Sequence, residues 1–221
     1  MAKRGLIIGT YDTAAQGWTL TPEWSFSDPV HVSKYLDVPG RRKGPLDVST
    51  VLTDGDPVYG SRTLTAVLEC SEGNRLERES RISIMTNWLD GWKADIVLPD
   101  DDLHYVVGRV SVSKLYNDLA HGSVRVTAIC EPWRYNKEET VVVLEGATDE
   151  QTATLPNQGR LAVIPLLSVT GGEVLLSVGK SSWALGPGTY ALPDLLLPQG
   201  GKAVTYSGTG VLTFTYREGI L

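Results

Sequence analysis

The histidines and the clustered acidic residues are the side chains of this chain that could bind a metal ion. The three histidines, His31, His104 and His121, lie far apart in the sequence, and none stands at the spacing of a zinc-binding motif. The run Asp100–Asp102 favours a solvated turn, because a calcium loop of the helix-loop-helix kind needs glycine at the position of Tyr105. The sequence therefore predicts no metal site.

Signatures of nucleophilic catalysis and of phosphate binding are also missing. No Gly-x-Ser-x-Gly motif occurs, and neither Cys70 nor Cys130 lies in a catalytic signature. Each cysteine instead ends an apolar, strand-like run, which favours a buried thiol over a disulfide. The run Gly179–Ser181 is not a phosphate loop, because Val174 stands where the first glycine of such a loop belongs. We therefore predict that the protein is not an enzyme and uses no cofactor; paired carboxylates that meet only in the folded chain are the open alternative.

The six tryptophans offer a different chemistry, because flat indole rings stack on the faces of sugars. Trp18, Trp24 and Trp183 lie in loop-like contexts, and Trp183 and Tyr190 are the aromatic residues that a carbohydrate-binding C-terminal domain would use. Burial in a core or an interface is the preferred interpretation, because an indole carries a large apolar area wherever it stands. Saccharide recognition is the alternative function.

Composition and charge exclude several classes of protein. The chain has 221 residues, 42% of them hydrophobic, which is enough for one large domain or two smaller ones. Its net charge of -6 argues against a protein that wraps nucleic acid, because such a protein concentrates positive charge on one surface. No stretch approaches the roughly 18–20 apolar residues that cross a bilayer, and the first apolar run is too short for a signal peptide. We therefore predict no membrane insertion.

The pattern of apolar and β-branched residues predicts a mostly β protein. Short alternating runs are separated by glycine and proline turns such as Gly186-Pro187-Gly188, a spacing that suits antiparallel sheets. Gly108 marks a β-bulge or the close approach of another backbone. The predicted strands cover Gly5–Gly9, His31–Leu36, Arg62–Cys70, Ala94–Leu98, Leu103–Lys114, Ser123–Ile129, Thr140–Leu144, Arg160–Val169, Glu173–Val178 and Gly210–Tyr216.

One segment, Arg75–Trp92, has helical periodicity instead, and Asp90-Gly91 provides a signal for the end of the helix. We expect Met85 and Trp88 to pack in a core rather than to bind a ligand. The apolar residues that fall close to one face of this predicted helix are Leu76, Ile82, Met85, Trp88 and Leu89.

A change in composition divides the chain near Tyr135. Most charged residues lie before this position, whereas Leu161–Leu221 is poor in charge. Pro132 is expected to end a strand there, because proline has no N–H to donate to a sheet. The sequence therefore predicts two domains, 1–135 and 136–221, of which the second is a compact β-sandwich of short strands.

Several stretches, in the same order along the chain, resemble one known family, the distal tail proteins of long, non-contractile-tailed bacteriophages. The resemblance implies an all-β fold with one helix, in which an N-terminal ring domain of β-sandwich or split-barrel kind precedes a galectin-like C-terminal β-sandwich. The stretches that carry it are RGLIIGTYDTAAQGWTLTPEW, YLDVPGRRKGPLDVSTVLTDGDPVYGSRTLTAVLEC, DGWKADIVLPDDDLHYVVGRVSV, RVTAICEPWRYNKEE, NQGRLAVIP and GTGVLTFTYREGIL.

The resemblance also implies a structural role in host attachment. Members of the family form a ring, a hexamer, that joins the tail-tube protein to a tail-associated hub or fibre protein, and some also carry a receptor-binding protein. Such a ring is assembled in the cytoplasm of the bacterial host and lies at the tail tip of the virion. DNA passes through its lumen without specific binding, and the net charge of -6 fits that role. The C-terminal domain is short for a galectin-like domain with extra binding loops, so the resemblance carries over the scaffold role and not lectin activity.

Two segments are the expected subunit contacts of such a ring. In DVPGRRKGPLDVS, Pro39-Gly40 and Gly44-Pro45 bracket three cations, which is typical of a hairpin tip or a projecting arm. The second segment is the aromatic-bearing Trp18–Phe26. Strand edges and extended hairpins can add to a neighbouring sheet, whereas ordinary surface loops are the alternative for both segments. The candidate contact residues are Trp18, Trp24, Phe26, Arg41, Arg42 and Lys43.

Overall fold

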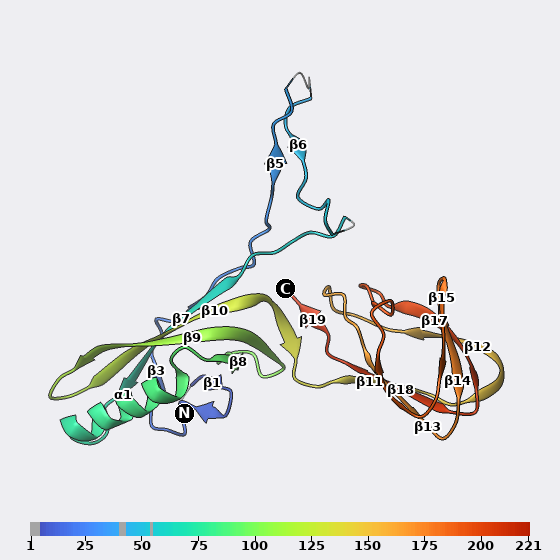
Figure 1. The fold of residues 1–221 in the computed structure, drawn as a ribbon. Coiled ribbons are helices and arrows are strands. Elements are labelled where there is room, and N and C mark those ends of the chain that lie inside the picture. The colour runs from blue at the N-terminus through green and yellow to red at the C-terminus, as the bar shows by residue number, and fades with distance from the viewer. Residues whose placement is uncertain (1–4, 40–42, 54) are drawn as a thin grey trace. The chain divides into compact units, whose positions relative to one another are not determined.

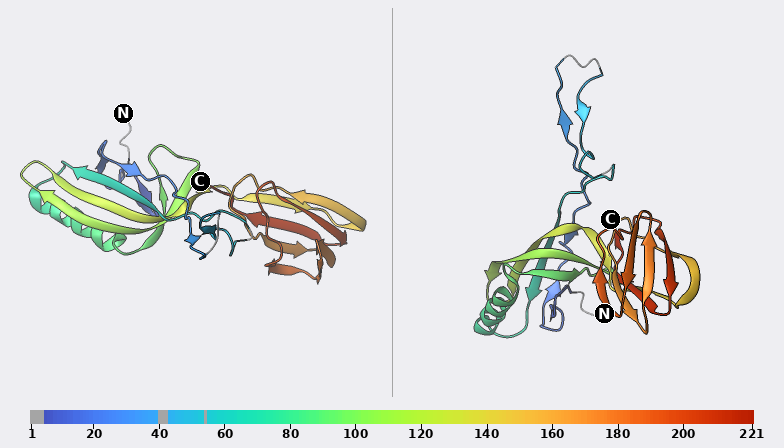
Figure 2. Two further views of the ribbon diagram at one scale, coloured as in Figure 1. Left: turned by 90° about the horizontal axis from the view of Figure 1, so that it is seen from above. Right: turned by 45° about the vertical axis from the view of Figure 1, so that its right-hand side comes forward.

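The computed structural model describes residues 5–39, 43–53 and 55–221 of the chain. These residues form two compact units that divide between Pro132 and Trp133, and both units can be followed in Figure 1 and Figure 2. We call them unit 1 and unit 2. The described part of the chain is mostly β with one helix, as the sequence predicts. Within these residues no helix combines the length and the apolar character needed to cross a membrane.

Unit 1 is built on one curled sheet (Figure 1). Its strands are β1 (Ile7–Ile8), β2 (Tyr11–Asp12), β3 (Thr19–Leu20), β4 (Ser25–Phe26), β7 (Arg62–Cys70), β8 (Lys93–Val97), β9 (His104–Asn117) and β10 (Gly122–Asn136). The order across the sheet is β2-β1-β8-β9-β10-β7-β3, and β4 also pairs with β7. The longest register joins β7 to β10 in antiparallel fashion, from Arg62 opposite Cys130 to Cys70 opposite Gly122.

Strand β10 passes through Pro132, where the sequence predicted a strand end. The pairing of β10 with β7 ends at Cys130, and Arg134 and Tyr135 pair with β19 (Gly219–Ile220) instead. Pro132 lies between these two registers, so its missing N–H interrupts neither of them. The proline therefore marks a change of partner rather than the end of the strand.

Helix α1 (Arg75–Leu89) forms where the sequence predicts it. Asn74 caps its start: the Asn74 side-chain oxygen accepts hydrogen bonds from the backbone N–H groups of Leu76 (2.9 Å) and Glu77 (3.0 Å). The Glu77 carboxylate accepts one in return from the Asn74 N–H at 3.0 Å, which completes a capping box. After Leu89 the chain turns at Gly91, whose φ of 80° lies in the left-handed region that glycine favours.

The predicted face of α1 is confirmed for Ile82, Met85 and Leu89 but wrong for Leu76 and Trp88. The buried residues are Arg78, Ile82, Met85 and Leu89. Successive residues turn by about 100°, so Leu76 lies roughly 150° around the helix from this face and Trp88 roughly 90°. Leu76 and Trp88 are therefore 82% and 62% exposed, and the prediction that Trp88 packs in the core is wrong.

The core of unit 1 lies between α1 and the sheet. It collects fully buried side chains from the N-terminal segment, the helix and the central strands. Trp18, Leu64, Met85 and Val126 have no exposed surface. The long central strands and the helix therefore hold each other in place through one shared core.

Unit 2 consists of two four-stranded sheets that share one core. The first has the order β11-β18-β13-β16 and the second β12-β17-β14-β15, all in antiparallel pairs. Leu155, Leu167, Leu176 and Phe214 come from both sheets and are fully buried between them. The strands are β11 (Thr140–Leu144), β12 (Ala147–Leu155), β13 (Leu166–Thr170), β14 (Val174–Val178), β15 (Ser181–Leu185), β16 (Gly188–Ala191), β17 (Lys202–Gly208) and β18 (Val211–Tyr216).

Several strand predictions need correction. The predicted strand Arg160–Val169 begins only at Leu166, because Pro165 precedes it and the N–H groups of Arg160 and Leu161 both donate to the Gly219 carbonyl. Strand β12 was missed, since its sequence ATDEQTATL is polar and mostly exposed, and only the pairing with β17 makes it a strand. Strand β17, with seven residues, was not predicted either. The other strands that the sequence did not predict have two to five residues: β2, β3, β4, β6 (Leu46–Asp47), β15, β16 and β19.

Gly108 of β9 permits a close approach between two strands. A Cβ at this position would lie 2.5 Å from the Cys130 Sγ and 3.3 Å from the Cys130 Cα. Both distances are shorter than normal packing allows, and Cys130 is itself only 1% exposed. Glycine is therefore required here for space and not for a left-handed backbone.

Gly108→Ala is expected to destabilise unit 1 by about 1–3 kcal/mol, because the added methyl overlaps the Cys130 thiol. The midpoint of urea-induced unfolding, followed by tryptophan fluorescence, measures the loss. Gly60→Ala is the matched control, since its Cβ would meet neighbours only at 3.6 and 3.7 Å. The double variant Gly108→Ala, Cys130→Ala should recover part of the stability. An unfolding midpoint for Gly108→Ala equal to that of the wild type would contradict the close packing.

Candidate assembly surfaces

Between β4 and β7 the chain leaves the sheet of unit 1 as a long two-stranded arm, which we define as residues 28–39, 43–53 and 55–61 (Figures 1 and 2). Its paired strands are β5 (Tyr35–Leu36) and β6. Backbone hydrogen bonds continue the ribbon toward the sheet: from Gly60 N to Val30 O (2.8 Å), from Val32 N to Val58 O (2.8 Å) and from Val48 N to Lys34 O (2.9 Å). The predicted hairpin is thus confirmed.

The arm exposes apolar side chains along its length. Tyr35 and Leu36 on β5 are 63% and 54% exposed, and Leu46, which lies opposite Leu36, is 39% exposed. A two-stranded hairpin without a core of its own is only marginally stable in water. Contiguous exposed apolar side chains of this kind are typical of a surface that a partner covers.

Of the predicted contact residues at the arm tip, Arg41 and Arg42 lie outside the described residues. Lys43 is exposed on the returning side of the arm. The structure therefore places one of the three predicted cations on the arm surface.

The aromatic contact residues predicted in Trp18–Phe26 lie in or against the core. Trp18 is fully buried, which corrects its assignment as a contact residue, because its side chain has no surface to present to another subunit. Trp24 and Phe26 are partly buried and pack on the same core. The Arg62 guanidinium lies 3.8 Å from the centre of the Phe26 ring, a cation–π contact that holds this ring at the edge of the sheet.

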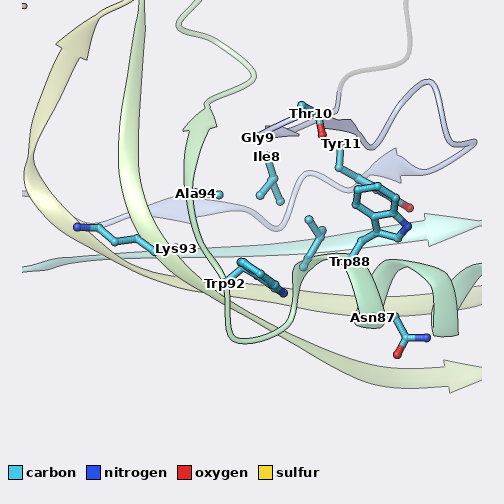
Figure 3. A pocket seen from close by; sticks show the side chains of 10 residues that line it. Ile8, Gly9, Thr10, Tyr11, Asn87, Trp88, Trp92, Lys93 and Ala94 are labelled. Atoms are coloured by element: carbon cyan, nitrogen blue, oxygen red, sulfur yellow. The ribbon is translucent and has the colours of Figure 1, made fainter.

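An apolar hollow opens between the end of α1 and the first strands of the sheet (Figure 3). Trp88 and Trp92 stand at its sides and are 62% and 67% exposed. The buried side chains of Ile8 and Leu89 line it between them, and its volume is about 390 Å³. Trp88 also borders a neighbouring hollow of about 300 Å³, where Ile84 is 47% exposed. The remaining lining of the larger hollow is Gly9, Thr10, Tyr11, Asn87, Lys93 and Ala94.

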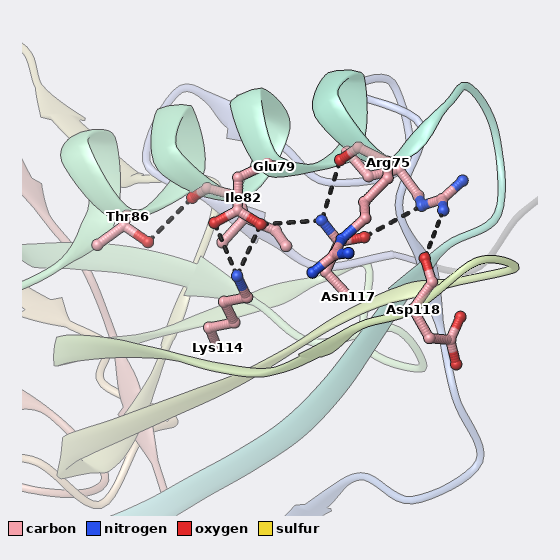
Figure 4. Close-up of polar contacts among 8 residues, drawn as sticks. Arg75, Glu79, Ile82, Thr86, Lys114, Asn117 and Asp118 are labelled. Atoms are coloured by element: carbon pink, nitrogen blue, oxygen red, sulfur yellow. Dashed lines mark hydrogen bonds and ion pairs between the residues drawn. The ribbon is translucent and has the colours of Figure 1, made fainter.

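Polar contacts from β9 hold α1, and with it Trp88, against the sheet (Figure 4). Lys114 Nζ donates to both carboxylate oxygens of Glu79, at 2.7 and 2.6 Å. Asn117 Nδ2 donates to Glu79 Oε2 at 2.8 Å and to the Arg75 carbonyl at 3.0 Å. The hydrogen bonds from Lys114 and Asn117 lower the pKa of Glu79 below its ordinary value.

Arg78 makes the buried part of this attachment. Its side chain is on the inner face of α1, and the residue is only 2% exposed. The guanidinium donates to the carbonyls of Asp118 (2.8 Å) and Leu119 (3.2 Å) in the turn after β9, to that of Gly73 (2.5 Å) and to Asn117 Oδ1 (3.3 Å). A planar guanidinium can serve all these acceptors at once, which explains why a charged residue is tolerated at a buried position.

The residues with potential for chemistry have structural contacts instead. Asp101 accepts hydrogen bonds from the N–H groups of Leu103 (3.3 Å) and His104 (3.1 Å), and its carboxylate lies 2.7 Å from His104 Nδ1. Partial burial opposes ionisation of Asp101, but His104 and these N–H groups outweigh it and lower the pKa of Asp101. Burial raises the pKa of Cys130 to about 11, so its thiol stays protonated. Across the described ranges, no three His, Cys, Asp or Glu side chains gather as a metal site would require.

The two aromatic residues considered for saccharide binding pack on the core of unit 2. Trp183 and Tyr190 are both partly buried against it. The Tyr190 hydroxyl donates to the Gly186 carbonyl at 3.0 Å, so its polar end is already engaged. Both rings therefore give part of their surface to the core.

Comparison with known proteins identifies a fold. No protein-family model matches the chain, and no curated protein matches it in sequence. Among solved structures it is similar to the crystal structure of the SPP1 Dit (gp 19.1) protein, described as a paradigm of hub adsorption apparatus in phages that infect Gram-positive bacteria. The TM-score is 0.65 and the sequence identity 13%, over 96% of this chain and 98% of that chain. The likeness shows the fold.

Two surface features escaped the sequence prediction. The sequence analysis assigns no role to Trp92, although it follows Trp88 by four residues, just after the predicted end of the helix at Asp90-Gly91. The pair Val51–Leu52 was also overlooked, although it is an aliphatic pair within DVSTVLTDGD, a run otherwise rich in turn-forming residues. A segment so rich in turn-forming residues cannot form a core strand. An aliphatic pair within it is therefore the signal that points to an exposed apolar surface.

Arg78→Ala is expected to destabilise unit 1 by about 1–3 kcal/mol, because the carbonyls in the turn after β9 lose their buried donor. Urea-induced unfolding measures this loss, and hydrogen exchange of the α1 amides reports whether the helix loosens first. The stability of Arg78→Lys should fall between that of the wild type and that of Arg78→Ala, since an ammonium cannot donate to all of the acceptors.

Arg75→Ala is the matched control, because Arg75 lies one turn earlier with an exposed side chain and should cost less than about 0.5 kcal/mol. Equal losses for Arg78→Ala and Arg75→Ala would show that the buried guanidinium does not hold the helix.

Proposed function

We propose that this chain is a structural, non-enzymatic subunit of a phage tail tip, and that copies of it assemble into a ring. The observation that carries the proposal is the likeness to the SPP1 Dit protein, because it extends over 96% of this chain and 98% of that chain. A shared fold over both units supports a shared scaffold role more strongly than a match to one domain would. The sequence resemblance to distal tail proteins points in the same direction.

The arm supports assembly into a closed ring. Head-to-tail contacts between identical subunits close into a ring when each contact turns the next copy by a fixed angle. Such a contact needs two different surfaces on one subunit, and a projecting arm with exposed apolar side chains is one of them. We propose that the arm, including Lys43, contacts the next subunit and that the ring is a hexamer.

The partners follow from this role. We propose that residues 1–135 form the ring and that 136–221 form a peripheral domain. The ring would join the tail-tube protein to the tail-associated hub or fibre protein at the tail tip, with a receptor-binding protein as a further partner. The net charge of -6 supports a lumen through which DNA passes without binding.

The mass of the full-length chain in solution, measured by light scattering alone and with the hub protein, tests this proposal. The expected result is a mass of six chains under at least one condition. A chain that stays monomeric under both conditions would rule out ring assembly.

Replacing two apolar arm side chains, Leu36→Ser with Leu46→Ser, should weaken association about a hundredfold or more, because each leucine buried in the contact contributes about 1.5–3 kcal/mol. Both side chains are exposed in the single chain, so its circular dichroism should not change. Leu119→Ser is the control: this leucine is 94% exposed in the turn between β9 and β10, away from the arm. An equal effect of Leu119→Ser would refute a specific role of the arm.

A further inference from the structure

The returning strand of the arm carries a tight turn, residues 48–53 and 55–56, which we call the knuckle. Its backbone is held by hydrogen bonds from Thr53 N to Thr50 O (3.2 Å), from Gly55 N to Thr50 O (3.2 Å) and from Asp56 N to Thr53 O (2.9 Å). These bonds order the turn without covering its aliphatic residues. Leu52 is 97% exposed and Val51 67% exposed.

An ordered turn that holds two aliphatic side chains in water calls for an explanation. In a disordered loop such residues would sample many positions, whereas the hydrogen bonds of this turn hold Val51 and Leu52 at the surface in one arrangement. Pre-organised apolar anchors of this kind cost little entropy when they enter a pocket on another surface. The knuckle therefore has the properties of the inserting half of a contact.

The hollow beside α1 has the properties of the receiving half. Its sides are the exposed rings of Trp88 and Trp92, and buried Ile8 and Leu89 line it. The Lys93 ammonium at this site is already paired with Glu131 at 2.7 Å, so its charge is compensated. The walls therefore select an apolar group over a charged one, and exposed tryptophans are the residues most often found to dominate binding at interfaces.

Filling this hollow with apolar groups is favourable. The residues that line the hollow are mostly apolar, so water in it finds few hydrogen-bond partners on its walls. Two aliphatic side chains would replace much of this water, and the exposed faces of Trp88 and Trp92 would be covered at the same time.

The arm of the same chain is not the occupant. In Figures 1 and 2 the arm points away from α1, the helix that carries Trp88. The inserting and receiving surfaces thus lie on different parts of unit 1, which is the arrangement of a head-to-tail contact between copies.

We propose that the hollow between Trp88 and Trp92 receives Leu52 and Val51 from the knuckle of a second copy of this chain. This inference rests on the proposed ring assembly and names the two surfaces that meet in it. Each subunit then inserts its knuckle into one neighbour and receives the knuckle of the other.

Disulfide trapping between copies tests the contact directly. A chain with Leu52→Cys is mixed with a differently tagged chain that carries Asn87→Cys, which lines the hollow and leaves both tryptophans in place. Native Cys70 and Cys130 are each 1% exposed and should not react. Oxidation of the assembled mixture is expected to give a covalent pair with one chain of each kind. The control pair, Leu52→Cys with Leu119→Cys, should give no such product.

Truncation of the receiving surface is the second measurement. Trp88→Ala and Trp92→Ala should each weaken association at least about tenfold, whereas Leu76→Ala, a more exposed apolar residue on another face of α1, should not change it. Quenching of tryptophan fluorescence by acrylamide should fall on assembly, because the two exposed indoles become covered.

The outcomes separate this contact from the proposed function. The contact is overturned if the ring assembles but oxidation gives no disulfide between positions 52 and 87, or if neither tryptophan variant weakens assembly. The proposed ring itself is then still supported. A neutral oligosaccharide or a different protein found in the hollow of the assembled ring overturns it equally. A wild-type chain that stays monomeric alone and with the hub protein removes both proposals.

Discussion

The docking of α1 on the curled sheet is the interaction on which the rest of unit 1 depends. Ile82, Met85 and Leu89 enter the core, and Arg78 closes the attachment by donating to the turn after β9. Once this face turns inward, the geometry of the helix leaves Trp88 at its edge and Leu76 in solvent. The hollow between Trp88 and Trp92 is thus a consequence of how the helix is seated, and the polar contacts of Glu79 with Lys114 and Asn117 keep its wall in place.

The two units differ in where they leave apolar surface exposed. Unit 2 closes two small sheets over one core, although Val141, Leu166 and Leu175 on its strands stay about half exposed. Unit 1 leaves apolar groups uncovered on the arm and beside α1. Apolar side chains gathered on a projecting arm and around a hollow are typical of surfaces that a partner covers, which supports the proposal that unit 1 forms the ring.

The groups that could have carried chemistry serve the fold. Asp101 organises the turn before β9, and His104 completes the same turn. Cys130 fills the space that Gly108 leaves, and burial keeps its thiol protonated. Each of these residues is used by its immediate neighbours.

The sequence by itself determined the mostly β character, the helix that begins after Asn74 and ends before Gly91, and the hairpin of the arm. At Gly108 it left a β-bulge and a close backbone approach as alternatives. The first three are local properties, because strand alternation, helix capping and turn signals depend on residues near in sequence, whereas the space at Gly108 is set by Cys130 on the neighbouring strand. Only the tertiary structure decided that Arg78, rather than Leu76 or Trp88, completes the buried face of α1, since periodicity gives the spacing of apolar residues but not what the helix packs against. Arg78 is buried because the turn after β9 supplies acceptors that no local pattern reveals. The polar strand β12 exists because β17 pairs with it, and β10 continues through Pro132 because its partners change there. In each case a contact between distant segments outweighed the local preference.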